Sequence, residues 1–200
     1  MSFKTRCLLL LSVMLVSTSL FLSCSKAEET TKLMQWNTAP KMSIDTNKKY
    51  TAVIETEKGD LVLELFAKDV PYTVNNFVFL ARQGYYDNTT FHRVIPDFMA
   101  QGGDPTGTGY GGPGYTLPTE FTSHKHIAGA ISMANTGQPN STGSQFFICY
   151  EPQPSLDGGY SVFGQLVEGM DVLLSLTPRD PDTNPQFPGD KINTIRINEE

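Results

Sequence analysis

The sequence predicts a mainly β fold, a closed antiparallel β-barrel capped by two helices. Its 200 residues include 17 glycines and 13 prolines, which indicates many turns. The apolar segments are short, and turns rich in glycine and proline separate them, the longest from Gly102 to Pro118. Only two segments favour helix, and the chain has no β-α-β alternation. This pattern favours an antiparallel barrel over a parallel sheet.

The first two strands are predicted to form a hairpin. Tyr50–Thr56 and Asp60–Phe66 are strand-like and are joined by Glu57-Lys58-Gly59. The three leucines of the second strand alternate with Val62 and Glu64, which places the leucines on one face. Further short apolar runs follow at Phe91–Ile95, Phe98–Ala100, Ala130–Ala134, Gln145–Tyr150 and Tyr160–Val167.

Two helices are predicted. The first begins at Asp69-Val70-Pro71, where the Asp69 carboxylate can accept free backbone N–H groups and proline is tolerated in the first turn. Gly84 is well placed to end it. The second helix is predicted over Met170–Leu176, before a last strand over Ile192–Ile197. The apolar residues of the first helix follow helical spacing: Val74, Phe77, Val78 and Ala81.

Length and charge limit the classes of protein. The chain is long enough for one domain with a full hydrophobic core. Its formal net charge is -6, and it has no run rich in lysine or arginine. Nucleic-acid recognition normally needs a basic patch, so nucleic acid is excluded as the expected partner.

The N-terminus is typical of an exported protein. Lys4 and Arg6 precede the apolar run Cys7–Leu22, whose 16 residues are short for a membrane span of about 20 but suit a signal peptide. The run ends in Phe21-Leu22-Ser23-Cys24, which resembles the lipobox of bacterial lipoproteins except for Phe21. That resemblance implies acylation of Cys24. The alternative is an ordinary signal peptide cut nearby, with Cys24 incidental.

These features predict three parts: a signal peptide over 1–23, a lipidated N-terminus and tether over 24–47, and a folded domain over 48–200. The domain is then expected on a membrane of the bacterial cell envelope, in the periplasm or at the cell surface. Ser25 after Cys24 favours the outer membrane over the inner one, by analogy with other bacteria.

The other reactive side chains suggest no further chemistry. Cys149 lies in an apolar run and is expected to be a buried, inert thiol. His124 and His126 have ligand-like spacing, but no cysteine or carboxylate cluster accompanies them, so a solvated loop is expected. Gly107–Gly112 lacks the following helix and the lysine of a phosphate-binding loop. No metal and no cofactor is therefore predicted.

Three blocks carry the functional signal. They are Phe91-His92-Arg93-Val94-Ile95-Pro96-Asp97-Phe98-Met99-Ala100-Gln101-Gly102-Gly103-Asp104, Ser132-Met133-Ala134-Asn135, and Gly143-Ser144-Gln145-Phe146-Phe147-Ile148. In this order and at these separations the chain resembles the cyclophilin family of peptidyl-prolyl cis–trans isomerases, over roughly residues 50–197. The resemblance implies an eight-stranded antiparallel barrel closed by two helices.

The resemblance also implies roles for individual residues. Arg93 matches the family's catalytic arginine. The walls of the pocket for the substrate proline match Phe98, Met99, Phe147 and Leu156, and Tyr160 occupies a groove position that is often histidine in the family. The residues that hold the substrate backbone match Gln101, Ala134, Asn135 and Gln145. Because successive strand residues face opposite sides, we expect Phe146 to point into the barrel and Phe147 into the groove.

The chemistry of proline isomerisation fits such a set. Rotation about an Xaa-Pro bond breaks amide resonance against a barrier of about 18–20 kcal/mol, but no bond is made, so neither a nucleophile nor a metal is needed. An apolar pocket can hold the proline ring, and a fixed donor can stabilise the twisted amide. Arginine suits this role because its planar group stays charged. We expect Gln101 to hold the Arg93 side chain in place.

The sequence also supports expectations about ligands, partners and an alternative function. Family members that bind cyclosporin tightly have a tryptophan where this chain has Ser155, so weak cyclosporin binding with retained catalysis is expected. The expected partners are proline-containing polypeptides of the envelope, and the protein is expected to be a monomer. The alternative is a lipid-tethered module that binds proline segments, or acts as a chaperone, with little turnover. Arg93 and Gln101 favour the enzyme, since a pure binder would need only the pocket.

Overall fold

The computed structural model describes residues 33–138, 140–183 and 185–200. The predicted signal peptide and Cys24 lie outside the described residues. Within the described ranges, none of the helices is both long and apolar enough to cross a bilayer.

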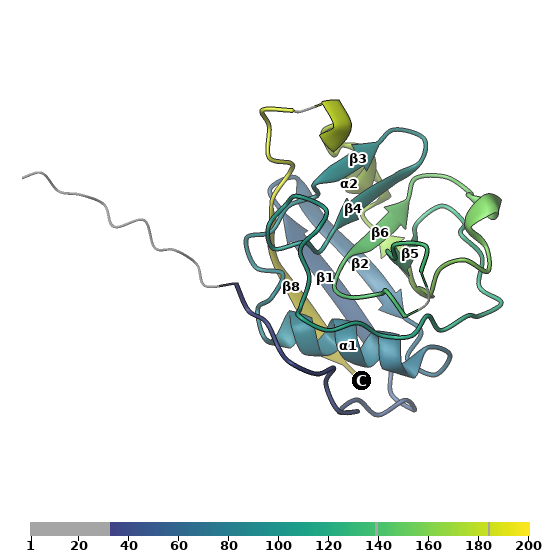
Figure 1. Cartoon of the computed structure of the whole chain (residues 1–200). Helices are drawn as coiled ribbons and strands as arrows, with labels where there is room; N and C mark the ends of the chain where they lie inside the picture. The colour runs from purple at the N-terminus through teal and green to yellow at the C-terminus, as the bar shows by residue number, and fades with distance from the viewer. Residues whose placement is uncertain (1–32, 139, 184) are drawn as a thin grey trace, which may run out of the picture. The chain divides into compact units, whose positions relative to one another are not determined.

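The fold is one antiparallel sheet of eight strands with two α-helices (Figure 1). Its spatial order is β3-β4-β6-β5-β7-β2-β1-β8, and every pair of neighbours is antiparallel. The strands are β1 (Tyr50–Thr56), β2 (Gly59–Leu65), β3 (Arg93–Ile95), β4 (Met99–Gly102), β5 (Ala130–Met133), β6 (Phe146–Cys149), β7 (Val162–Glu168) and β8 (Ile192–Glu199). The prediction of a mainly β, antiparallel fold is confirmed.

The sheet curls into a half-barrel, so the prediction of a closed barrel is wrong. Its edge strands β3 and β8 share no ladder, and only one bridge, Thr90 with Lys191, spans the segments before them. The outer edge of β3 is occupied instead by Arg179: Val94 donates its N–H to the Arg179 carbonyl at 2.7 Å, and Arg179 donates back at 2.9 Å. Because β3 has only three residues, this exchange uses the backbone groups that closure would need.

The first hairpin forms as predicted. β1 pairs with β2 in register from Tyr50–Leu65 to Thr56–Gly59. The three leucines of β2 are buried, whereas Val62 and Glu64 are not. The alternation read from the sequence therefore sets which face of this hairpin lines the core.

Helix α1 (Pro71–Arg82) occupies the predicted segment, but its N-terminus is satisfied differently. The N-cap residue is Val70, with no side-chain hydrogen bond of its own. Glu120 supplies the acceptor instead: its carboxylate receives the N–H of Tyr72 at 3.3 Å, the N–H of Thr73 at 2.6 Å and the Thr73 hydroxyl at 2.7 Å. Asp69, the predicted cap, pairs with His124 at 2.7 Å.

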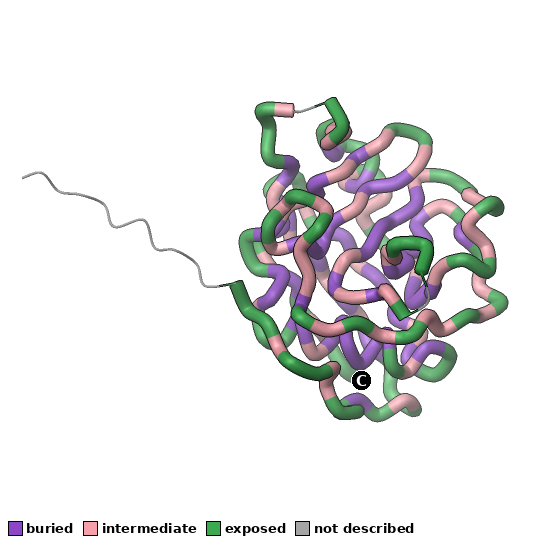
Figure 2. The backbone as a smooth tube through the Cα atoms, viewed as in Figure 1, coloured by how far each residue is buried: buried purple, intermediate pink, exposed green. Residues whose placement is uncertain are grey.

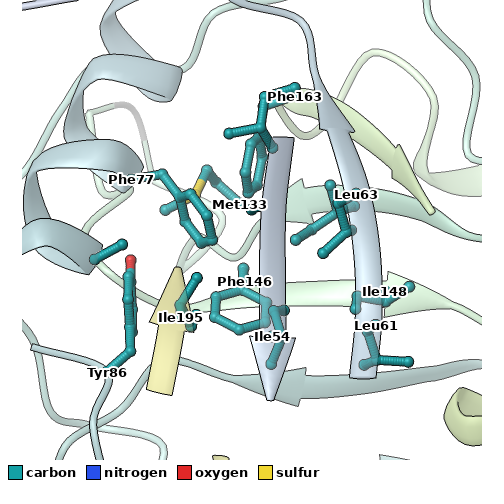
Figure 3. Packing of buried hydrophobic residues seen from close by; sticks show 14 of the residues in the cluster. Ile54, Leu61, Leu63, Phe77, Tyr86, Met133, Phe146, Ile148, Phe163 and Ile195 are labelled. Atoms are coloured by element: carbon teal, nitrogen blue, oxygen red, sulfur yellow. The ribbon is translucent and has the colours of Figure 1, made fainter. Parts of the chain in front are cut away.

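The core fills the concave side of the half-barrel. In Figure 2 the buried chain runs through the interior and the exposed chain lies around it. Figure 3 shows Phe77 of α1, Phe146 of β6 and Ile54 of β1 in one group of buried side chains, and the rings of Phe77 and Phe146 pack edge to face at 5.7 Å between centres. The short helix α2 (Met170–Leu174) lies at the end of the half-barrel opposite α1 (Figure 1).

Residues 33–47, the described part of the predicted tether, pack against the domain. The Trp36 ring packs on Phe79, 5.2 Å between ring centres. Ile44 is buried, and its N–H and that of Ser43 donate to the Asn75 side chain. We call residues 33–44 the N-terminal strap.

Candidate active site

Four of the predicted site residues lie in two rows on the convex face of the half-barrel. Strand register places Arg93 of β3 opposite Gln101 of β4, which in turn lies opposite Phe147 of β6. The second row is two residues further along the strands and consists of Ile95, Met99 and Cys149. Directly paired residues share a face, so both rows point outward.

The residues between these two outward-facing rows point into the core. Val94, Ala100 and Ile148 are buried in the main hydrophobic cluster, together with Phe146. Phe147 belongs to a separate cluster, so the expectation that Phe146 and Phe147 face opposite sides is confirmed.

The separate cluster is an apolar patch at the predicted proline pocket. Its buried members are Met99, Phe147 and Cys149. The partly buried residues that pack against them are Ile95, Phe98, Ala134, Leu156 and Tyr160. Every residue predicted as a wall of the proline pocket, and Tyr160, is therefore in one cluster. Partial exposure of its outer members leaves apolar surface for a small ring such as that of proline.

Arg93 lies at the edge of this cluster. Its guanidinium carbon lies 5.8 Å from the centre of the Phe98 ring, a cation–π distance, and its Nη1 lies 3.9 Å from the Met99 sulfur. The turn Pro96–Asp97 returns the chain from β3 to β4, with Asp97 in the left-handed region at φ 61°. This tight return brings Phe98 beneath the guanidinium group. Arg93 is half-buried, and its guanidinium group is held in orientation by the neighbouring apolar side chains.

Gln101 does not hold Arg93, and that expectation is wrong. Among the described residues its amide has one hydrogen bond, which Nε2 donates to Oε1 of Gln145 at 2.9 Å. Gln145 in turn donates through Nε2 to the carbonyl groups of Gly109 and Gly111, each at 2.9 Å. The Gln101 Nε2 group needs an acceptor, which Gln145 supplies and a guanidinium group lacks, and the hydrogen bond of Arg93 goes to the Met99 sulfur instead of the Gln101 oxygen. The pair therefore joins β4 to the loop over the groove.

A groove of about 620 Å³ adjoins the apolar patch. It shares Ala134 with the patch and also contains Gln101, Asn135 and Gln145, the residues predicted to hold the substrate backbone. Asn135 is fixed by donation of its side-chain amide to the Gly159 carbonyl at 2.9 Å. The predicted residues for ring and backbone thus lie in two adjoining depressions.

One carboxylate organises the loop over this groove. Asp104 is fully buried and accepts hydrogen bonds from the N–H groups of Thr106, Thr108, Gly109 and Gly111. Burial alone would raise the pKa of Asp104, but these hydrogen bonds and the Thr106 hydroxyl outweigh it and lower the pKa. The carboxylate therefore stays charged and keeps this loop in shape.

Two residues behind the apolar patch were missed by sequence reasoning. His126 is buried, not in a solvated loop as expected, and its ring stacks on Phe147 at 5.9 Å. Its Nδ1 lies 3.0 Å from Oδ1 of Asp157, and its Nε2 lies 3.2 Å from the Ser132 hydroxyl. The backbone and side-chain hydrogen bonds from His126 lower the pKa of Asp157 to about 2. Asp157 follows Leu156 directly, so this pair fixes one side of the apolar patch.

The remaining candidates behave as inert groups. Burial raises the pKa of Cys149 to about 12, so it remains a protonated thiol, as expected. Ser155 is exposed in the short 3₁₀ helix Pro154–Leu156. The described part of the chain contains no group of three or more histidine, cysteine and acidic side chains placed to bind a metal ion.

Comparison with known proteins agrees with this geometry. The sequence model of the family described as cyclophilin type peptidyl-prolyl cis-trans isomerase/CLD matches residues 51–197. The chain therefore belongs to the cyclophilin family, and it is a peptidyl-prolyl cis–trans isomerase.

Its relatives include proteins of distant organisms. A peptidyl-prolyl cis-trans isomerase of Synechococcus elongatus is 55% identical over 146 residues, which are 73% of this chain and 94% of the relative. Peptidyl-prolyl cis-trans isomerase B of Bacillus subtilis is 51% identical over 127 residues, 62% of this chain and 88% of the relative.

The fold has solved counterparts. A cyclophilin type isomerase of Cryptosporidium parvum superposes with a TM-score of 0.69 at 39% identity, covering 76% of this chain and 99% of that one. A second structure of that protein was determined in the presence of the dipeptide Ala-Pro, and it superposes with a TM-score of 0.68 at 40% identity over 75% of this chain and 99% of that one.

Proposed function

We propose that Arg93 is the catalytic residue of this isomerase and that the protein acts on Xaa-Pro bonds of envelope proteins from a lipid anchor at Cys24. The observation that supports the catalytic role is the position of Arg93, at the edge of the apolar patch and in one row with Gln101 and Phe147. A proline ring on the patch would bring its amide within reach of the guanidinium group.

The proposed mechanism needs no covalent step. The patch around Met99 and Phe147 holds the proline ring and removes water from its amide, whose planar form water favours. As the bond twists, the proline nitrogen becomes pyramidal and basic, and Arg93 donates a hydrogen bond to it. Because this bond exists only in the twisted state, it lowers the barrier without stabilising the planar substrate equally. The contacts with Phe98 and Met99 keep the guanidinium group oriented before the substrate arrives.

The proposed substrate-binding site has two parts, one for the proline ring and one for the backbone around it. The dipeptide present with the Cryptosporidium parvum isomerase is Ala-Pro, which supports proline as the residue recognised here. The backbone around that proline would lie against Ala134 and Asn135, which join the patch to the 620 Å³ groove. We further propose that the protein is a monomer, which sedimentation of the purified protein would test.

The proposed location rests on the N-terminal sequence. Leu33, the first described residue, is nine residues beyond Cys24, and nine extended residues reach at most about 32 Å. An acylated Cys24 would therefore hold the domain close to the membrane surface. Palmitate labelling of cells expressing the full chain tests this: label is expected on the wild type and absent from Cys24→Ala. Equal labelling of both would contradict the anchor.

The catalytic proposal is tested with an isomerisation assay on a short Xaa-Pro peptide. Arg93→Ala is expected to lower kcat/KM by about a hundredfold or more. Arg82→Ala is the matched control, because it removes an arginine whose partner is the exposed Glu199. Equal rates for wild type and Arg93→Ala would favour the alternative, a module that binds proline segments with little turnover.

A further inference from the structure

The N-terminal strap lies outside the family's matched region yet reaches the groove. The family match begins at residue 51, whereas the strap comprises residues 33–44. Gln35 lines the 620 Å³ groove together with residues of the loop over it, Gly109 to Thr116. The strap therefore adds a wall that the matched domain does not itself supply.

The strap is held in place at both ends. Near its start, Trp36 donates its N–H to the Pro113 carbonyl at 2.8 Å, and its ring packs on Phe79 and Tyr85. Near its end, the Asn75 side chain accepts from Ser43 and donates to the Lys41 carbonyl at 3.1 Å. Asn75 is only 2% exposed, so these hydrogen bonds are shielded from water.

The surroundings of Gly114 show that the strap lies in close contact with the loop over the groove. Its φ of +90° favours glycine, and a side-chain carbon there would lie 2.7 Å from the Trp36 carbonyl oxygen and 3.3 Å from the Gln35 Cβ. A larger residue would push the strap away from the loop. Glycine at position 114 therefore allows the strap to keep Gln35 against the groove.

The chemistry of the groove indicates its ligand. None of the described residues that line it carries a charge, and five of them are glycines. It adjoins the patch for the proline ring at Ala134. An extended peptide with its proline on the patch would continue into this groove. Uncharged residues with free backbone groups fit such a lining best, because charged side chains would lose water without gaining a partner.

We propose that Gln35 contacts the substrate segment that precedes the proline, which makes the strap a specificity-determining element of this isomerase. The exposed amide of Gln35 can donate to a backbone carbonyl and accept from a backbone N–H. This inference rests on the proposed placement of the proline ring on the apolar patch. The substrate site would then include the N-terminal strap as well as the matched domain.

The test compares two peptides on the mature chain carrying Cys24→Ala. The short peptide is blocked Ala-Pro, and the long one has three more uncharged residues before the alanine. Gln35→Ala is expected to lower kcat/KM for the long peptide by about three- to tenfold, mainly through KM, as for one neutral hydrogen bond. The rate for the short peptide should not change. Asn37→Ala, an exposed strap residue that does not line the groove, is the matched control and should change neither rate.

An unchanged ratio between the two peptides in Gln35→Ala, or an equal loss for both, would overturn the inference. A direct readout uses the side-chain amide resonances of Gln35, identified by their loss in Gln35→Ala. They are expected to shift with the long peptide and not with the short one, and no shift with either would also overturn it. A wild-type chain that binds but does not isomerise the short peptide would contradict the proposed function instead, and the resonance shift would still test the strap.

Discussion

Arg93 and Gln101 lie directly opposite each other on β3 and β4, yet their side chains have different partners. The Arg93 guanidinium group lies on Phe98 and Met99, whereas the Gln101 amide donates to Gln145. The site thus separates into a cation held by apolar groups and an amide pair that supports the groove. Mutations of the two residues should have different kinetic effects.

Gln101→Ala should raise KM by about three- to tenfold and leave kcat within about threefold of the wild type. The reason is that it removes the hydrogen bond to Gln145, worth about 0.5–1.5 kcal/mol, without touching the guanidinium group. Steady-state kinetics on a short peptide check this, with the exposed Gln186→Ala as control. A loss of kcat as large as that of Arg93→Ala would show that Gln101 positions Arg93 after all.

Ser155→Trp should increase affinity for cyclosporin at least tenfold, with peptide turnover retained. An indole at this exposed position beside Leu156 would add apolar area and an N–H donor. Titration of the inhibition of isomerase activity measures the change, and Ser155→Ala serves as control. Inhibition of the wild type at nanomolar drug would contradict this prediction.

Glu120→Ala should lower the free energy of unfolding by about 1–2 kcal/mol. Glu120 accepts the first free N–H groups of α1 and places a negative charge at its positive end. Asp69→Ala removes only the exposed pair with His124 and should cost less than about 1 kcal/mol. Urea unfolding of both variants measures this difference. An equal decrease in the free energy of unfolding would indicate that Asp69 contributes to the cap as much as Glu120 does.

His92 should make the protein less stable as the pH falls below about 6.5. His92 is only 1% exposed, and this burial lowers its pKa. The unfolded chain therefore takes up a proton at a higher pH than the native state does, and stability present above pH 6.5 is lost towards the lower native pKa.

His92→Gln, which is neutral at every pH, should reduce this dependence. Between pH 6.5 and 5 the slope of unfolding free energy against pH should fall by up to about 1.4 kcal/mol per pH unit. His124→Gln is a surface control. Identical slopes for wild type and His92→Gln would show that His92 does not titrate differently in the two states.

Local patterns predicted much of this fold. The alternation of leucines in β2, the spacing in α1 and the opposite facing of Phe146 and Phe147 depend on neighbours in the chain, so the sequence carries them directly. The family resemblance then predicted the walls of a proline pocket, and these residues share one apolar cluster in the structure.

Contacts between distant segments were not predictable in this way. Glu120 caps a helix that begins 49 residues earlier, at Pro71, and Asp157 accepts a hydrogen bond from the backbone N–H of His126 across 31 residues. Arg179, not β8, occupies the edge of β3 and leaves the barrel open. Such partners depend on the tertiary arrangement, and neither periodicity nor residue preference encodes them.

The central claim is that Arg93 acts on the twisted amide, not on the bound ground state. NMR exchange spectroscopy on a saturating Xaa-Pro peptide measures its affinity and its cis–trans exchange rate on the enzyme in one experiment. In Arg93→Ala the exchange rate should fall by about a hundredfold or more, while the dissociation constant stays within about threefold of the wild type. Exchange at the wild-type rate in Arg93→Ala, or a rate loss explained entirely by weaker binding, would contradict the claim.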